Sequence, residues 1–308
     1  MYTMWKSRWF KILVVVLVIL AGAYWWLVIN SEPASSQFSL DIAEMRHLAN
    51  SLPGDKPTEI RTEQIASFRF PAAALMAGDS WTMQSMPASS YQLVYPDGHS
   101  IVIDSAMNAE QAKAMGTTNG FDSAAYDRMS QAMRRASLIL ITHEHPDHLG
   151  GVAANAGAPQ VMQALRLTRQ QVENIDRAKP VVFPPSALSG YKPLEYDRIA
   201  AVAPGVVLIR APGHTPGSQL VFVRTADRKE VLFLGDVAWH LRNVEWVKER
   251  PRLLTMSMKE DRTQVLSELA ALHDLSQADS TIYLVPGHDG DVIASLIRLK
   301  VLVHGFKE

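Results

Sequence analysis

Ile141-Thr142-His143-Glu144-His145-Pro146-Asp147-His148 is the stretch of this sequence that decides the fold. It continues the apolar residues 138–141, which predict a short buried strand, and it places four possible metal ligands in one H-x-H-x-D-H run. On an extended segment, His143 and His145 alternate and project to the same side. Asp147 and His148 follow Pro146, which favours a helix start and lets them turn towards a second ion. The run therefore predicts a metal site at a strand end.

Three further apolar strand candidates also end in glycine-containing turns that carry a ligand-type residue. The ligand-type residues in these turns are His214 in A-P-G-H-T-P-G-S, Asp236 in F-L-G-D and His288 in V-P-G-H-D. Taken alone, His214 or Asp236 is as consistent with a turn residue or a helix cap. Rigid strands fix side chains and their loops let backbones approach each other, so the recurrence predicts one shared site at the edge of a sheet sandwich.

The complete set of motifs resembles the metallo-β-lactamase-fold hydrolase superfamily, in the family's order and over roughly residues 60 to 295. The resemblance implies an α/β protein, an αββα four-layer sandwich, with a dinuclear metal centre that usually holds zinc. It also implies the ligands: His143, His145 and His214 for one metal, Asp147, His148 and His288 for the other, and Asp236 bridging both. Asp104, which ends the apolar 101–103 segment, resembles the family carboxylate that orients a metal-binding histidine.

Imidazole and carboxylate are suitable ligands for this chemistry in a chain without cysteine. Zn²⁺ accepts both when thiolate is lacking, although the same donors also suit iron or manganese. Two close metals lower the pKa of a shared water, hold it as hydroxide and polarise the carbonyl that it attacks. Asp147 would then be the catalytic residue that orients the hydroxide and passes a proton to the leaving group.

Among the branches of the superfamily, the pattern is most similar to the lactonase and glyoxalase II-like branch. The absence of cysteine and the bridging Asp236 are unlike β-lactamases, which makes β-lactam hydrolysis a minor alternative. Lactonases of this kind place a tyrosine three positions after the bridging aspartate, where this chain has Trp239. An indole donates only through its N–H, so the expected substrate is a lactone or thioester, with homoserine lactone itself in question. Trp239 and His240 are weak candidates for the substrate pocket. Arg250 is as consistent with surface packing as with a cleft wall.

A different class remains open, because mononuclear iron persulfide dioxygenases share many of these motifs. They are oxidoreductases that hold one iron through two histidines and the aspartate, so metal content would separate them from a dinuclear hydrolase. A membrane sensor without catalytic activity is a more distant alternative.

The composition of the 308 residues is that of a globular enzyme that acts on small molecules. The 47% hydrophobic content can form a large core, and a net charge of −1 lacks the basic footprint of a nucleic-acid-binding protein. Cysteine is absent, which excludes thiolate ligands and disulfides without fixing the compartment.

The N-terminus predicts a membrane anchor. Residues 12–29 form an uncharged apolar run that Lys6, Arg8 and Lys11 precede, and no Lys or Arg follows it until Arg46. The positive-inside rule then predicts a single-pass inner-membrane protein with its catalytic domain on the periplasmic or extracytoplasmic side. A cleaved signal peptide is the alternative, since Ala21-Gly22-Ala23 has the form of a cleavage site.

The remaining pattern predicts three parts: an anchor over 1–30, a linker with an amphipathic helix over 31–58, and a catalytic domain over 59–308. Within the third part, alternating or apolar runs predict strands at 91–95, 100–104, 206–209, 220–223, 231–234 and 281–285. Helical patterns cover 121–136, 261–273 and 292–303. Strands mixed with helices indicate sheets covered by helices on their outer faces.

Overall fold

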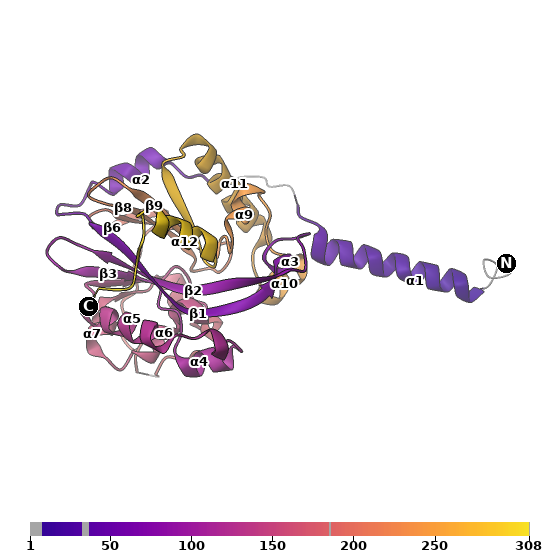
Figure 1. The fold of residues 1–308 in the computed structure, drawn as a ribbon, viewed down its shortest axis with the longest axis horizontal. Helices are drawn as coiled ribbons and strands as arrows, with labels where there is room; N and C mark the ends of the chain where they lie inside the picture. The colour runs from indigo at the N-terminus through magenta and orange to yellow at the C-terminus, as the bar shows by residue number, and fades with distance from the viewer. Residues whose placement is uncertain (1–7, 33–36, 185, 308) are drawn as a thin grey trace.

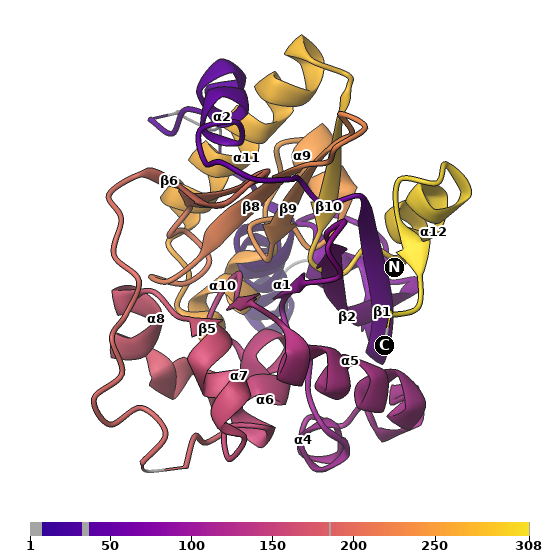
Figure 2. The same ribbon diagram turned by 90° about the vertical axis from the view of Figure 1, so that its left-hand side faces the viewer.

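A computed structural model describes residues 8–32, 37–184 and 186–307; Lys6, one of the basic residues before the apolar run, lies outside them. Two β-sheets pack face to face in the body of the molecule, and helices cover their outer faces (Figures 1 and 2). The predicted α/β sandwich with two sheets is confirmed.

One sheet has six strands in the order β11-β1-β2-β3-β4-β5, and the other has five in the order β10-β9-β8-β7-β6. Most neighbours are antiparallel, while β1–β11, β3–β4, β4–β5 and β9–β10 run parallel. The strands are β1 (Glu59–Pro71), β2 (Met83–Val94), β3 (Ser100–Ile103), β4 (Leu138–Leu140), β5 (Leu165–Arg166), β6 (Ile199–Ala203), β7 (Val206–Arg210), β8 (Gln219–Arg224), β9 (Glu230–Gly235), β10 (Ile282–Pro286) and β11 (Val303–His304).

The helices fall into an N-terminal group, a group between the first strands and a C-terminal group. They are α1 (Arg8–Tyr24), the π-helix η1 (Trp25–Ile29), α2 (Ile42–Leu48), α3 (Ala72–Leu75), α4 (Ala109–Ala114), the 3-10 helix η2 (Thr118–Gly120), α5 (Ser123–Arg135), α6 (Pro146–Ala154), α7 (Pro159–Ala164), α8 (Arg169–Glu173), the 3-10 helix η3 (Ile175–Ala178), α9 (Leu241–Glu245), α10 (Arg252–Met258), α11 (Arg262–Ala278) and α12 (Gly290–Arg298).

Alternation along the strands divides most of the buried apolar residues between a cluster that joins the two sheets and one cluster on each outer face. Ile101 and Ile103 face the second sheet, where they pack with Leu208 and Phe233, because successive side chains of a strand point to opposite faces. Val102, between them, points outward against helices. One apolar layer therefore joins the sheets, and it positions the strand ends that carry the predicted ligands.

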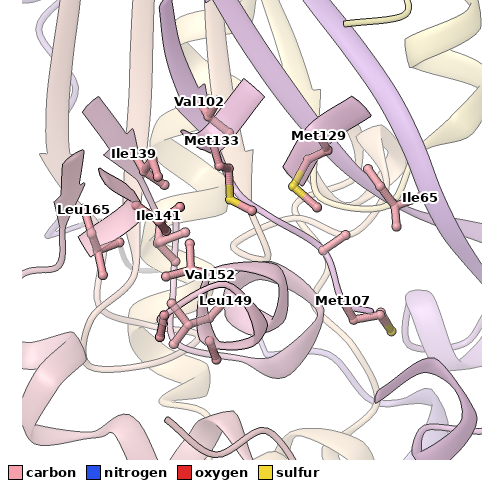
Figure 3. Close-up of a cluster of buried hydrophobic side chains, with 14 of the residues drawn as sticks. Ile65, Val102, Met107, Met129, Met133, Ile139, Ile141, Leu149, Val152 and Leu165 are labelled. Carbon is pink, nitrogen blue, oxygen red and sulfur yellow. The ribbon is translucent and has the colours of Figure 1, made fainter. Parts of the chain in front are cut away.

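Helices fill the outer faces. Met129 and Met133 of α5 and Leu149 of α6 pack against Val102 and Ile139 of the six-stranded sheet (Figure 3). On the opposite side, α2 and α11 cover the five-stranded sheet (Figure 2). The helix predicted within the linker is α2, and its Met45 is 1% exposed in this layer. This part of residues 31–58 therefore packs as one of the outer helices.

The C-terminal segment differs from its prediction. The helix expected over 292–303 ends at Arg298, and Lys300 has a left-handed backbone with φ of 56°. The chain then forms β11, which pairs with β1 through Arg61↔Val303 and Thr62↔His304. A left-handed residue cannot continue a helix, so the segment turns back to complete the edge of the sheet.

The helix α1 projects away from the body of the molecule (Figure 1). None of its residues is buried. Arg8–Ile29 spans 22 residues with a mean hydropathy of 2.8, which is long and apolar enough to cross a membrane, a test that a signal sequence also passes.

Candidate metal centre

All seven predicted ligands converge at one edge of the sandwich. His143 and His145 follow β4, and Asp147 and His148 occupy the first turn of α6. The other three follow β7, β9 and β10. Possible ligand atoms lie within 4.8 Å of one another in two groups, which are His143, His145, His214 and Asp236, and Asp147, His148 and His288.

Asp236 stands between the two groups and turns one oxygen towards each. Its Oδ2 lies 3.6 Å from His143 Nε2 and 3.4 Å from His214 Nε2. Its Oδ1 lies 3.2 Å from both His148 Nε2 and His288 Nε2. A carboxylate placed in this way has the geometry needed to bridge two cations.

The buried atoms of this site fit a metal. His143 Nε2, His148 Nε2 and Asp236 Oδ1 are buried and have no hydrogen-bond partner among the described residues. Leaving such groups unpaired is costly, and divalent cations bound at the two groups would satisfy all three. The donors are imidazole nitrogens and carboxylate oxygens, which suit zinc, iron or manganese.

Two glycines let the ligand loops approach each other. A Cβ at Gly287 would overlap Asp236 Oδ1, and one at Gly213 would lie 2.6 Å from Val265 N. Any larger residue would push these loops apart. The glycine that precedes the histidine in both P-G-H turns is therefore required by the close packing around the site.

Backbone and carboxylate groups hold the histidines of the second group from outside. His148 Nδ1 donates to Asp104 Oδ2 at 2.7 Å, and Asp104 also accepts from Thr142 N and Oγ1 at 2.7 and 2.8 Å. Asp104 adopts a left-handed backbone, with φ of 58°, to make these contacts. His288 Nδ1 donates to the carbonyl of Pro87 at 2.9 Å. Contacts of this type fix the ring orientation of a ligand.

A buried ion pair holds the first group. His214 Nδ1 lies 2.5 Å from Glu260 Oε1, which also accepts from Arg250 Nε at 2.9 Å. The side chains of Arg250 and Glu260 are both fully buried. The sequence was consistent with Arg250 either on the surface or in the wall of a cleft, and it did not identify Glu260. Neither residue has a recognisable motif around it.

Glu144, which the sequence analysis also left without a role, joins two of the motifs. It is buried, and its carboxylate accepts from Thr215 Oγ1 at 2.7 Å and from Gly217 N at 3.2 Å. Its place between two histidines on an extended segment was the available signal, since alternation points it to the opposite side. It ties the H-x-H segment to the loop that carries His214.

Burial and neighbouring charges set the protonation of the ligands. Burial holds the pKa of His143 and of His145 well below the usual range, which keeps their lone pairs free to bind a metal. Burial also opposes charge on His148, but the carboxylates of Asp236, Asp104 and Asp147 raise its pKa well above the usual value. Burial would raise the pKa of Asp236, yet the surrounding histidines, His288 foremost, hold it well below the usual range.

The two weak pocket candidates lie in different surroundings. Trp239 is 7% exposed and donates its indole N–H to Asp236 Oδ2 at 2.7 Å, while the Arg250 guanidinium lies 4.8 Å from its ring centroid. Its single donor is therefore engaged with Asp236. The His240 ring lies 3.1 Å from Asp289 Oδ2 and lines a small cavity of about 220 Å³.

The sequence did not indicate a larger cavity of about 750 Å³, whose lining contains none of the seven candidate ligands. It is lined by the ends of β1 and β2, including Phe68, Phe70 and Met83, and by the segment after α4 that contains Met115. The Phe68 ring also stands edge-on to the His288 imidazole, with centroids 6.4 Å apart. One wall residue of the cavity therefore contacts a residue of the second group of ligands.

The family model described as the metallo-beta-lactamase superfamily matches residues 86–288, which include six of the seven candidate ligands within their span and His288 at its end. The chain belongs to the metallo-β-lactamase superfamily. This membership agrees with the resemblance drawn from the motifs.

Its relatives within the superfamily include lactonases. An N-acyl homoserine lactonase of Bacillus thuringiensis is 30% identical over 149 residues, which cover 46% of this chain and 57% of that protein. Another from a Bacillus species is 33% identical over 107 residues, covering 35% and 40% of the two chains. The chain therefore spans only about half the length of the curated relatives it matches.

Solved structures of similar fold include two lactonases. A quorum-quenching N-acyl homoserine lactone lactonase aligns with a TM-score of 0.60 and 18% identity over 78% of this chain and 95% of its own. An N-acyl homoserine lactone hydrolase, with the product N-hexanoyl-L-homoserine at its catalytic metal centre, aligns with a TM-score of 0.61, 18% identity and coverage of 78% and 96%. At this identity the likeness shows the fold.

Proposed function

We propose that this protein is a metal-dependent hydrolase that cleaves the ester bond of a small molecule, either a lactone or a thioester. The observation that carries the proposal is the position of Asp236, whose two oxygens face two separate groups of histidines. The similarity to lactonases supports the reaction class.

The residues divide into two metal-binding sets. His143, His145 and His214 would hold one cation, Asp147, His148 and His288 the other, and Asp236 both; we propose zinc, with iron or manganese as alternatives. When bound, a pair of divalent cations supplies Lewis acidity and lowers the pKa of water at the site. The buried partners of the histidines hold each ring in place and keep bulk water away from it.

Asp147 is the residue that we assign to proton transfer. Its side chain is 13% exposed, against 4% or less for His143, His148, His214, Asp236 and His288, so it lies on the open side of the centre. Its Oδ2 lies 3.4 Å from His288 Nε2, and we assign proton transfer to its other oxygen. From there it would take a proton from the attacking water and pass it to the leaving oxygen or sulfur.

The contact of Trp239 affects the choice of substrate. The family tyrosine at this position helps to bind the carbonyl of homoserine lactone, whereas the only donor of Trp239 is directed at Asp236. We therefore propose a lactone or thioester whose carbonyl is bound without this residue.

We also propose that the enzyme is exported and anchored in the inner membrane by α1, with the catalytic domain on the periplasmic side. Arg8 and Lys11 precede the apolar span, which supports this orientation. We retain residues 1–30 as the anchor. The packing of α2 supports counting it with the catalytic domain, although it lies before residue 59.

Metal analysis of the purified full chain, followed by a substrate panel, tests the proposal. We expect two equivalents of metal and chelator-sensitive hydrolysis of lactones or thioesters, with weak or no activity on β-lactams and phosphoesters. Asp147→Asn should lose turnover while retaining the metal held by His143, His145 and His214. One equivalent of iron with oxygen consumption would instead establish the mononuclear oxidoreductase, and a fully loaded protein inert on the whole panel would refute the hydrolase.

A further inference from the structure

The anchor helix and the large cavity lie at the same end of the molecule. The strands β1 and β2 run towards α3, α10 and the base of α1 (Figure 1). Their last paired residues are Phe70↔Gln84 and Pro71↔Met83, and the 72–82 turn that follows contacts the end of the N-terminal helix.

Four contacts fix the base of this helix to the body. Gly78 N donates to Val28 O at 3.1 Å, and Trp81 Nε1 donates to Tyr24 Oη at 3.2 Å. The Arg252 guanidinium lies 4.5 Å from the centroid of the Trp26 ring. Ser31 Oγ donates to Glu249 Oε2 at 2.8 Å. The direction of the helix relative to the catalytic body is therefore set by contacts and does not depend on a free linker.

Large apolar side chains surround this attachment and are open to solvent. We call them the apolar rim, and they are Phe70, Trp81, Met83, Leu253 and Met256, which are between 40% and 63% exposed. Single exposed apolar residues are ordinary, but a group that continues an exposed apolar helix marks an interaction surface. Trp25 and Trp26, at the end of that helix, are of the residue type that favours the membrane–water interface.

The rim shares side chains with the wall of the large cavity. Phe70 and Met83 belong both to the rim and to the wall of the 750 Å³ cavity. Phe68, two residues along β1 from Phe70, lines the same cavity and contacts the His288 ring. The cavity wall thus includes rim side chains at one end and a ring that contacts a metal-binding histidine, together with the polar residues Ser67, Arg69, Ser85, Thr117 and Asn119.

We propose that the apolar rim lies in the interface of a lipid bilayer and that the cavity receives the acyl chain of an amphiphilic ester directly from that bilayer. The substrate class builds on the proposed hydrolase function. We assign the bilayer as the partner that covers the rim, because α1 would enter the bilayer beside the rim. The fixed attachment of α1 then holds the rim against the same membrane surface.

The depth of the rim can be measured with the full chain in vesicles of phosphatidylcholine and phosphatidylglycerol. The chain has no cysteine, so single cysteines can carry an environment-sensitive fluorophore without background. Met256→Cys reports the rim and Val18→Cys reports α1. Asp97→Cys, in the turn after β2, is the control, because β2 separates it from the rim by about 35–40 Å. We expect nitroxide lipids to quench the fluorophore at positions 256 and 18 but not at 97.

The outcomes separate the two proposals. If nitroxide lipids quenched the fluorophore at position 18 but not at position 256 or 97, the anchor would stand and the docking of the rim would be overturned. No quenching at position 18 would overturn both the anchor and the docking. Neither result depends on catalysis, so the hydrolase proposal is judged separately by its own substrate panel.

A matched pair of substitutions tests delivery from the bilayer. Leu253 is 58% exposed in the rim, and Leu299 is 60% exposed at the end of α12, before β11 joins the far end of β1. In vesicles, Leu253→Glu should lower kcat/KM about tenfold for a long-acyl lactone and leave a short, water-soluble lactone unchanged, because a charge is expelled from the interface. Leu299→Glu should change neither. Equal effects of Leu253→Glu on both substrates, or none on either, would overturn the proposal.

Discussion

The metal centre and the mouth of the cavity are built in contrasting ways. In the centre, His143, His148 and Asp236 have side chains no more than 4% exposed, and buried partners surround them. At the mouth, Phe70 and Met83 are 40% and 48% exposed and lie on strand ends. The difference indicates that the reaction depends on a rigid set of contacts, whereas substrate choice depends on a surface that can change without disturbing them.

The largest effect should come from the residue that joins both halves of the centre. Asp236→Asn keeps the shape of the side chain but removes the charge that faces four histidines. We expect kcat/KM to fall about a thousandfold or more, with loss of bound metal measured by elemental analysis. Asp227→Asn, in the β8–β9 turn, is the surface control. Full metal content and activity in Asp236→Asn would show that the centre tolerates the loss of this carboxylate and would contradict the contrast with the cavity mouth.

The loop carrying His214 should make stability depend on pH through Glu268. Burial raises the pKa of Glu268 to about 8, and its carboxylate accepts from Gly213 N at 3.0 Å. Between about pH 4.5 and 8 the unfolded chain loses this proton while the folded chain keeps it, so the contribution of Glu268 to stability decreases as pH rises. The free energy of unfolding of Glu268→Gln should therefore fall less between low and high pH than that of the wild type, by on the order of 3 kcal/mol.

Urea unfolding of the detergent-solubilised chain at pH 5, 6.5 and 8.5 measures this effect. Glu245→Gln, at an exposed position of α9, should follow the wild type throughout. Parallel curves for the wild type and Glu268→Gln would show that this carboxyl does not couple the His214 loop to pH.

A smaller effect should follow from Glu260, which contacts His214 from outside the metal site. Glu260→Gln keeps the side-chain shape but removes the charge between Arg250 and His214. We expect metal affinity to fall about 10- to 100-fold, measured by competition with a chelator. The variant also leaves Arg250 buried without its charged partner, so stability should fall as well.

The double variant Arg250→Met/Glu260→Gln separates these two effects. It removes the unpaired buried charge and should recover stability without recovering metal affinity. If affinity returned together with stability, Glu260 would act on the fold and not on the orientation of His214.

The smallest effect should come from the cavity mouth. Phe70→Ala removes part of the apolar wall, so we expect kcat/KM for a long-acyl ester to fall about fivefold, with metal content and folding unchanged. Leu52→Ala is the matched control, since Leu52 is 38% exposed in the turn after α2. A loss of metal in Phe70→Ala would show that the mouth and the centre are not separable.

The sequence predicted the centre better than the mouth because its signals are local. Each ligand follows an apolar strand and lies in a turn whose glycine or proline is visible in the sequence, as with Gly287 before His288. The seven side chains accordingly meet at one sheet edge. The six-stranded sheet was harder to predict, because its edge strand β11 is only two residues long. This strand forms where Lys300 turns the chain back towards β1.

The contacts that the sequence did not predict all depend on tertiary packing. Arg250 and Glu260 meet His214 from the segments around α10, and no local pattern distinguishes them from surface charges. The cavity is formed by β1, β2 and the segment after α4, which are far apart in the chain. Trp239 was identified as an unusual residue, but its contact with Asp236 became visible only in the structure.

The left-handed backbone of Asp104 carries a cost in strain that its buried hydrogen bonds offset. A non-glycine residue in this conformation costs about 1 kcal/mol or more, and here it lets one carboxylate accept from Thr142 and His148 together. Asp104→Gly would relieve the backbone and release His148 in the same step. The same step would leave the N–H of Thr142 and the Nδ1–H of His148 buried without an acceptor, which costs more than the strain that it relieves, so the fold and the site both require this aspartate.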